Sequence, residues 1–283
     1  MPIKSVVALD ELAEGSILSV SADRLIEKIR EANGKGRMNL NLEGANFAEA
    51  HFGGLKLRYA SLTTASLVRA NFQGSDMEGA WMDDTDLTEA TFGNGFFRGV
   101  SFERSRLGNA TLMEATFEGV NMVDAFLGGA NARGAMFGVS NFQGADLRGA
   151  DFRNCDLMNC NLAKANLEGV NFSSAKISRT NLPVESLSEA NFQRAYMAEC
   201  FLRGADLRST KLRGADLRFA NLEGANLSEM DLRGVNFTET NLKGADLRGA
   251  NLENAVFHNA NLSATLVDAR VVETVGVAIK AVG

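Results

Sequence analysis

Three cysteines and two histidines are the side chains of this chain best suited to nucleophilic or metal chemistry. Zinc sites need closely spaced pairs of such residues, and the spacing of Cys155, Cys160 and Cys200 does not provide them. His51 and His258 stand near opposite ends of the 283 residues. The sequence also contains no glycine-rich phosphate loop before a helix and no nucleophile elbow. We therefore predict a protein that is not an enzyme and has no metal and no cofactor.

A five-residue hydrophobic period decides how all these side chains are positioned. The period holds one phase from Leu40 to Ala269, and its large apolar centres run from Leu42 to Val267. These 46 centres are 25 Leu, 14 Phe, four Met, one Ile, one Ala and one Val. A small residue, most often Ala, stands two positions before each centre, and Asn or Asp often lies between the two. Such an internal repeat excludes an ordinary arrangement of helices and loops.

A five-residue period fits neither an α-helix nor a straight strand. Five helical steps of about 100° leave successive centres about 140° apart, so no apolar stripe forms. In a strand, an odd period sends successive centres to opposite faces. The centres share one core only if the chain turns at every repeat, which gives a four-sided coil of about 20 residues. Stacked at about 4.8 Å, between 11 and 12 such coils form a rod about 55 Å long.

The side-chain types indicate which positions face inward in such a coil. We expect each centre and the small residue two positions before it to fill the core, so the three cysteines, which occupy small-residue positions, are interpreted as buried thiols. Glycines two positions after a centre, such as Gly44 and Gly144, suit corners with unusual backbone angles. Pro183 and Glu185 interrupt the pattern without changing its phase. We expect a bulged coil there, with Glu185 turned outward because a buried charge is costly.

These repeats, such as ANFAE, ADLRG and ANLEG, resemble the A(N/D)LXX motif of the pentapeptide-repeat family. The resemblance covers most of the chain, from Leu40 to Ala269, and implies an all-β solenoid, the right-handed quadrilateral β-helix. The handedness comes from the family alone. A short helix followed by the step GKGR into the array is similar to cyanobacterial members in particular.

The repeat divides the chain into three segments. Residues 1–39 are predicted to form an N-terminal arm and a short α-helical cap, with Ile26 and Ile29 on the apolar face of the helix. Residues 40–269 form the β-helix. Residues 270–283 either cap the last coil or form a homodimer contact, because an open solenoid end exposes core residues and strand edges.

Composition narrows the surroundings and the partners. The net charge of −6 disfavours direct binding to nucleic acid. No stretch is long and apolar enough to span a membrane. The N-terminal residues carry acids where a signal peptide needs an apolar core, and three unpaired cysteines suit a reducing compartment, so we expect a cytoplasmic protein. That the protein is bacterial is implied by the resemblance to cyanobacterial members.

Six aromatic residues are expected to point outward in three neighbouring columns, along one side of the rod and its corner. They form two groups about six coils, or about 30 Å, apart. They are Tyr59, Trp81, Phe96, Tyr196, Phe201 and Phe219. Exposed aromatic patches suit a protein partner. The alternative is that these rings pack flat on the wall.

Charged residues are also distributed unevenly. An acidic band beside Trp81 contains no Lys or Arg and consists of Asp76, Glu78, Asp83, Asp84, Asp86 and Glu89. Further on, arginines align in two neighbouring basic columns with acids interleaved: Arg133, Arg153, Arg213 and Arg233 in one, and Arg148, Arg208 and Arg248 in the next. Such columns are typical of a solvated, edge-protecting surface, and an anionic partner is the other interpretation.

Two hypotheses for function follow. The first is a rigid, non-catalytic scaffold that presents the aromatic side and the acidic band to another protein. The alternative comes from the resemblance: some pentapeptide-repeat proteins resemble B-form DNA, bind DNA gyrase or a related topoisomerase, and protect it from quinolones. The chain has 29 basic residues beside its 35 acidic ones, which weakens this alternative, because a DNA mimic should be negative along its whole length.

Overall fold

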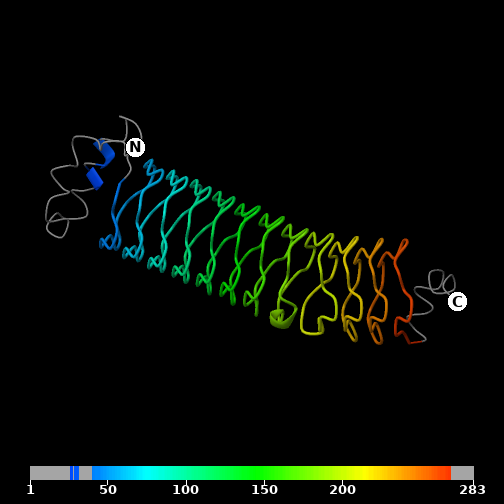
Figure 1. The fold of residues 1–283 in the computed structure, drawn as a ribbon. Helices are drawn as coiled ribbons and strands as arrows, with labels where there is room; N and C mark the ends of the chain where they lie inside the picture. The colour runs from blue at the N-terminus through cyan, green and yellow to red at the C-terminus, as the bar shows by residue number, and fades with distance from the viewer. Residues whose placement is uncertain (1–25, 28, 32–39, 269–283) are drawn as a thin grey trace, which may run out of the picture.

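The computed structural model shows a rod of stacked coils (Figure 1), and it describes residues 26–27, 29–31 and 40–268. The five-residue centres and the small residues before them point inward along almost the whole rod. Leu57, Ala60 and Leu62, for example, have no exposed surface. The predicted inward positions are therefore confirmed.

Parallel β-bridges set the size of each coil. Each bridge joins the residue before a centre to its counterpart four repeats later, from Asn41 with Ser61 to Asp246 with Leu266. Ladder hydrogen bonds connect the same coils: the Leu42 N–H donates to the Ser61 carbonyl at 2.7 Å, and the Ser61 N–H donates to the Leu40 carbonyl at 2.8 Å. Since each coil contains four repeats and the chain turns once in every repeat, the coil has four sides, as predicted.

Each corner is a tight turn that spans four residues of one repeat. The Ala45 N–H donates to the Leu42 carbonyl at 3.2 Å, and Gly44 has a φ of 67°. Positive φ at the third residue is the mark of a type II turn. Many corners hold other residues in this conformation, including Phe219 with a φ of 60°, so glycine is not required there.

The recurrent Asn or Asp completes the backbone hydrogen bonding of the repeats that contain it. Four of the five backbone N–H groups in a repeat donate to carbonyl groups in the ladder or the turn. The fifth, which follows the centre, donates instead to the side chain of the Asn or Asp before the centre. The Ser173 N–H, for instance, donates to Asn171 Oδ1 at 3.1 Å. An unpaired backbone donor is costly, and this accounts for the second position of the motif.

Phenylalanine centres stack along the rod axis. Phe117 stands between Phe97 and Phe137, one coil away on either side, with ring centroids 4.9 and 5.1 Å apart. Similar stacks join Phe52 to Phe72 and Phe172 to Phe192. The core is thus a set of side-chain columns in register with the backbone ladder.

One corner of the rod is irregular. The short 3-10 helix η2 (Val184–Ser186) replaces the usual turn after Pro183. Glu185 is exposed, which confirms its predicted outward direction. The Ser186 N–H bonds within this helix, and the Ser186 hydroxyl donates to the Ala165 carbonyl at 2.7 Å, where a backbone N–H donates in regular coils. A side chain therefore replaces one ladder bond at the bulge.

The end segments are only partly described. Residues 26–27 and 29–31 are helical, and Ile26 and Ile29 are buried in the same hydrophobic cluster as Leu40 and Leu42. The helix start and the arm before it, the end of the helix, and residues 270–283 lie outside the described residues. The predicted segment boundaries and the cap or dimer role of the C-terminal segment therefore stay predictions.

Candidate functional site

The six aromatic residues singled out from the sequence differ in exposure. The rings of Trp81, Phe96, Phe201 and Phe219 are exposed, by 49%, 54%, 65% and 52%. Tyr59 and Tyr196 are half-buried. Six steps of the coil register separate Trp81 from Phe201, so the structure keeps the two predicted groups apart.

The two tyrosines lie against the wall. The ring of Tyr59 covers Gly79, and a Cβ added to that glycine would come within 2.6 Å of Tyr59 Cε1. The guanidinium of Arg218 lies 5.8 Å from the centre of the Tyr196 ring and also bonds to Asp216. Both rings therefore pack against other surface residues. For Tyr59 this agrees with the alternative that the outward rings lie flat on the wall of the rod.

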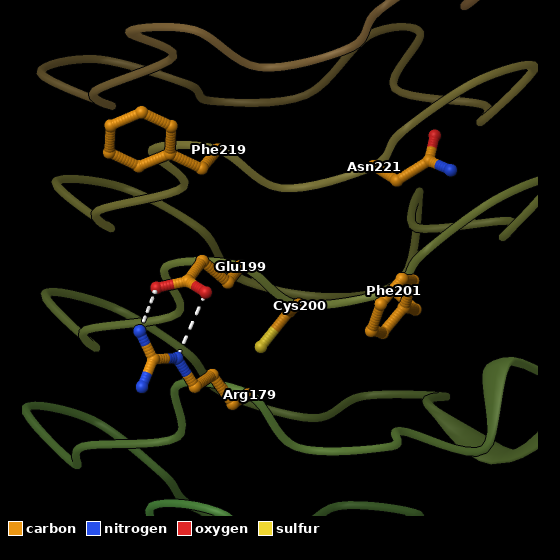
Figure 2. A pocket seen from close by; sticks show the side chains of 6 residues that line it. All are labelled: Arg179, Glu199, Cys200, Phe201, Phe219 and Asn221. Atoms are coloured by element: carbon orange, nitrogen blue, oxygen red, sulfur yellow. Dashed lines mark hydrogen bonds and ion pairs between the residues drawn. The ribbon is translucent and has the colours of Figure 1, made fainter.

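A shallow depression lies between the two exposed phenylalanines of the second group (Figure 2). It has a volume of about 560 Å³ and lies beside Phe201 on one side and Phe219 on the other. Phe219 is held at a corner by its left-handed backbone, and Phe201 lies on the adjoining side, one coil earlier. Asn221, the residue that pairs with Phe201 in the ladder, also lines the depression.

An ion pair forms the remaining rim of this depression. Arg179 and Glu199 stand one coil apart, and the guanidinium donates twice to the carboxylate, with both distances 2.9 Å. The hydrogen bonds from Arg179 lower the pKa of the Glu199 carboxyl. Because each charge is matched by the other, the depression presents two apolar rings beside a neutral polar rim.

Cys200 lines the base of the depression but is suited to packing, not to chemistry. Its thiol is buried and donates to the Ile177 carbonyl at 3.1 Å. Burial raises the pKa of Cys200 to about 12, and it has the same effect on Cys155 and Cys160. A thiol that stays protonated is a poor nucleophile and metal ligand. The interpretation of all three cysteines as core thiols is confirmed.

The predicted acidic band is partly neutralised by arginines from neighbouring coils. Arg58 Nε lies 2.7 Å from Asp76 Oδ2, and its Nη1 lies 3.1 Å from Glu78 Oε2. Arg104 Nη2 lies 2.8 Å from Asp84 Oδ2, and this contact lowers the pKa of the Asp84 carboxyl. Three of the six carboxylates thus have an arginine partner that the linear sequence does not place beside them.

The band is also not a single patch. Its six acids run from Asp76 to Glu89, which is nearly three of the four repeats in a coil, so they wind around more than one side of the rod. Asp83 accepts hydrogen bonds from the Ser101 hydroxyl and the Glu103 N–H, and Asp86 accepts them from Thr88. The structure therefore corrects the expected band to a set of separate, mostly bonded carboxylates.

Most arginines in the two basic columns are paired within their own repeat. In each such repeat the Asp before the centre holds the Arg after it. Guanidinium–carboxylate distances run from 2.5 to 2.7 Å for Arg148, Arg153, Arg208, Arg233 and Arg248. The hydrogen bond from Arg148 lowers the pKa of Asp146, and its counterparts do the same for Asp151, Asp206, Asp231 and Asp246. This pairing supports the interpretation of a solvated surface.

Within the described part of the chain, no group of three or more His, Cys, Asp or Glu side chains is arranged to hold a metal ion. The described residues likewise include no helix with the length and apolarity of a membrane span.

The sequence did not predict three residues that line the depression beside Phe201 and Phe219. Arg179, Glu199 and Asn221 are not aromatic, and the aromatic columns alone do not show a hollow between the two phenylalanines. The register of the coils offers the missing signal, because it places Arg179 and Glu199 in one column with opposite charges.

The sequence model of the Pentapeptide repeats family matches the chain in eight copies. The matched residues are 41–80, 82–119, 110–149, 140–179, 186–218, 215–254 and 236–265. The chain belongs to this family, and its fold is the right-handed quadrilateral β-helix of pentapeptide-repeat proteins. Proteins of this family are generally non-catalytic structural repeat proteins.

Solved structures of pentapeptide-repeat proteins are similar to the chain. One is HetL of the cyanobacterium Nostoc sp. strain PCC 7120, involved in the regulation of heterocyst differentiation. Its identity is 26%, the match covers 84% of this chain and 94% of HetL, and the TM-score is 0.23. Another is trypsin-treated QnrB1, a plasmid-mediated fluoroquinolone resistance protein, at 22% identity, 85% and 99% coverage, and a TM-score of 0.34. Comparison with curated protein sequences gave no match.

Proposed function

We propose that this chain is a non-catalytic scaffold that binds another protein through the depression between Phe201 and Phe219. The observation that supports this most is the pair of exposed phenyl rings on either side of one apolar hollow. Aromatic side chains around a pocket are the usual anchors of protein interfaces. The partner would place an apolar side chain between the rings, and its polar groups would meet the Arg179–Glu199 rim.

The rigidity of the rod makes this surface a good docking site. The Glu199 N–H donates to the Arg218 carbonyl at 3.0 Å, the Phe219 N–H donates to the Thr238 carbonyl at 3.1 Å, and Phe201 pairs with Asn221 of the next coil. These ladder contacts fix the backbone that carries the two rings. A pre-organised surface loses less conformational entropy when it binds a partner. In the described part of the chain, the inside of the rod is filled by one continuous hydrophobic core, which supports a scaffold role over an enzymatic one. Three buried, unpaired thiols support a reducing, cytoplasmic location.

The alternative of a DNA mimic that binds gyrase has weaker support. A mimic needs unpaired acids along the rod, whereas many acids here are bonded to arginine within a repeat or to the next coil. The alternative remains an outcome of the test.

The test uses affinity capture from the source cell with three forms of the full chain. These are the wild type, the double variant Phe201→Arg/Phe219→Arg and the control Phe126→Arg, whose ring is equally exposed but lies in another column. We expect one protein to be captured by the wild type and the control and lost from the double variant. Circular dichroism establishes that all three forms fold.

A purified partner then makes the result decisive. Hydrogen exchange should show protection around residues 199–221 in the wild-type complex. Equal binding by the double variant would refute the proposed surface. Capture of gyrase or topoisomerase subunits, with protection of supercoiling from a fluoroquinolone, would establish the alternative instead.

A further inference from the structure

A second hollow runs along another corner of the rod, and it is polar. It has a volume of about 640 Å³ and extends across five coils, from Ser173 to Glu253. Three arginines on successive coils line its middle: Arg194, Arg213 and Arg233. The interpretation of basic columns as solvated surface does not account for a groove at this place.

Two of these three arginines differ from the paired arginines of the basic columns. Arg233 bonds to Asp231 at 2.7 Å, in the usual pairing within a repeat. Among the residues that the structure describes, neither Arg194 nor Arg213 forms an ion pair or a side-chain hydrogen bond. For Arg213 the reason is local, because Lys211 occupies the position that Asp231 occupies in the next coil. Arg194 stands at a corner with a φ of 57°, and its own repeat, from Ala190 to Arg194, contains no Asp or Glu.

Two glycines keep the floor of the groove low. Gly214 and Gly234 occupy its corner positions with φ values of 70° and 68°. A Cβ on Gly234 would meet nothing closer than Gly214 Cα at 3.9 Å, and one on Gly214 would lie 3.4 Å from Arg194 Cγ. The missing side chains therefore leave only the backbone at these two corners, and the Arg194 side chain lies directly beside Gly214.

The charge around the groove is opposite to that of the whole chain. The charged residues that line it are Arg194, Arg213, Arg233 and Glu253, which gives 3 − 1 = +2, against −6 for the chain. Asp231 also interacts electrostatically with Arg213, and Glu253 with Arg233. The positive charge is thus centred on Arg194 and Arg213, and Glu253 marks the acidic end.

We propose that this groove binds an extended, acidic peptide segment of a partner protein. Five coils span about 19 Å at about 4.8 Å per step, the length of about six extended residues at about 3.3 Å each. Guanidinium groups bind carboxylates with two parallel hydrogen bonds, and the donors of Arg194 and Arg213 form no hydrogen bonds within the described structure. The groove is separate from the phenylalanine depression, so the proposal holds whether or not that surface binds.

The experiment measures binding of a fluorescein-labelled hexaglutamate peptide by fluorescence anisotropy, at 50 mM salt. The double variant Arg194→Gln/Arg213→Gln should bind at least tenfold more weakly. The control is Arg148→Gln/Arg248→Gln, which removes the same charge from arginines already bonded to Asp146 and Asp246. It should stay within about twofold of the wild type, and Glu253→Gln should bind several-fold more tightly.

Each other outcome overturns the proposal. No binding by the wild type, or an equal loss in both double variants, would mean that no specific anion groove exists. Equal affinity for a diglutamate peptide would refute the extended occupant. The variant Phe201→Ala/Phe219→Ala should leave hexaglutamate binding unchanged, so failure of the phenylalanine surface and failure of the groove give different results.

Discussion

Replacement of Phe117 by Ala tests whether the inward columns carry the stability of the rod. Phe117 has no exposed surface and packs between Phe97 and Phe137. The centroid of the Phe92 ring lies 5.9 Å from that of Phe117. Phe→Ala in a core costs about 3–5 kcal/mol, and each aromatic pair adds about 0.5–1.5 kcal/mol beyond buried area. We therefore expect a loss of about 4–5 kcal/mol, because the ladder on both sides prevents the coil from collapsing into the cavity.

The assay is denaturation by urea, followed by far-ultraviolet circular dichroism and by fluorescence of Trp81, the single tryptophan. Repeat arrays can unfold in parts, so the two signals must coincide before a free energy is extracted. Phe126→Ala, on an exposed ring, is the control and should cost less than about 0.5 kcal/mol. If Phe117→Ala were as mild as Phe126→Ala, the reasoning about stacked inward columns would be refuted.

Two further predictions concern the recurrent Asn and Asp. Asn171→Ala removes the acceptor for the Ser173 N–H and should lower the free energy of unfolding, measured in urea, by about 1 kcal/mol. Asn171→Asp keeps an acceptor and should change it little. Equal effects of the two variants would contradict the role assigned to the motif. Folding lowers the pKa values of Asp146, Asp151 and Asp206. The stability that their arginine pairs contribute is therefore complete above the pKa of Asp in the unfolded chain, about 4, and is lost as the pH falls through the lower pKa of the folded protein. The urea midpoint should therefore change little between pH 7 and 5 and fall below pH 4, and the triple Asp→Asn variant should show a smaller fall.

Much of the fold could be predicted because its information is local and repeated. The inward direction of centres such as Leu57 and Phe117 follows from a period that neither a helix nor a straight strand can use. The outward direction of Glu185 follows from the cost of burying a charge. The 3-10 helix η2 and the Ser186 hydroxyl bond to Ala165 were not predictable, because several local geometries can replace one turn without changing the phase.

The candidate surface was only partly predictable. The columns identified Phe201 and Phe219 as outward and neighbouring. They did not separate these exposed rings from Tyr59, whose ring lies in the space left by the missing side chain of Gly79 in the next coil. The hollow between the phenylalanines depends on side-chain directions at a corner, which the repeat does not specify.

The sequence by itself determined the four-sided coil, the inward columns and the burial of the three thiols, because each follows from the five-residue pattern that the repeats share. The tertiary structure decided which charges meet. Arg58 with Asp76, Arg104 with Asp84 and Arg179 with Glu199 belong to neighbouring coils, and only the stacking of coils brings them into contact. The stacking of coils also decided which surface arginines lack a bonded carboxylate. In the described structure Arg194 and Arg213 have no such partner, because neither their own repeats nor the neighbouring coils place a carboxylate within bonding distance.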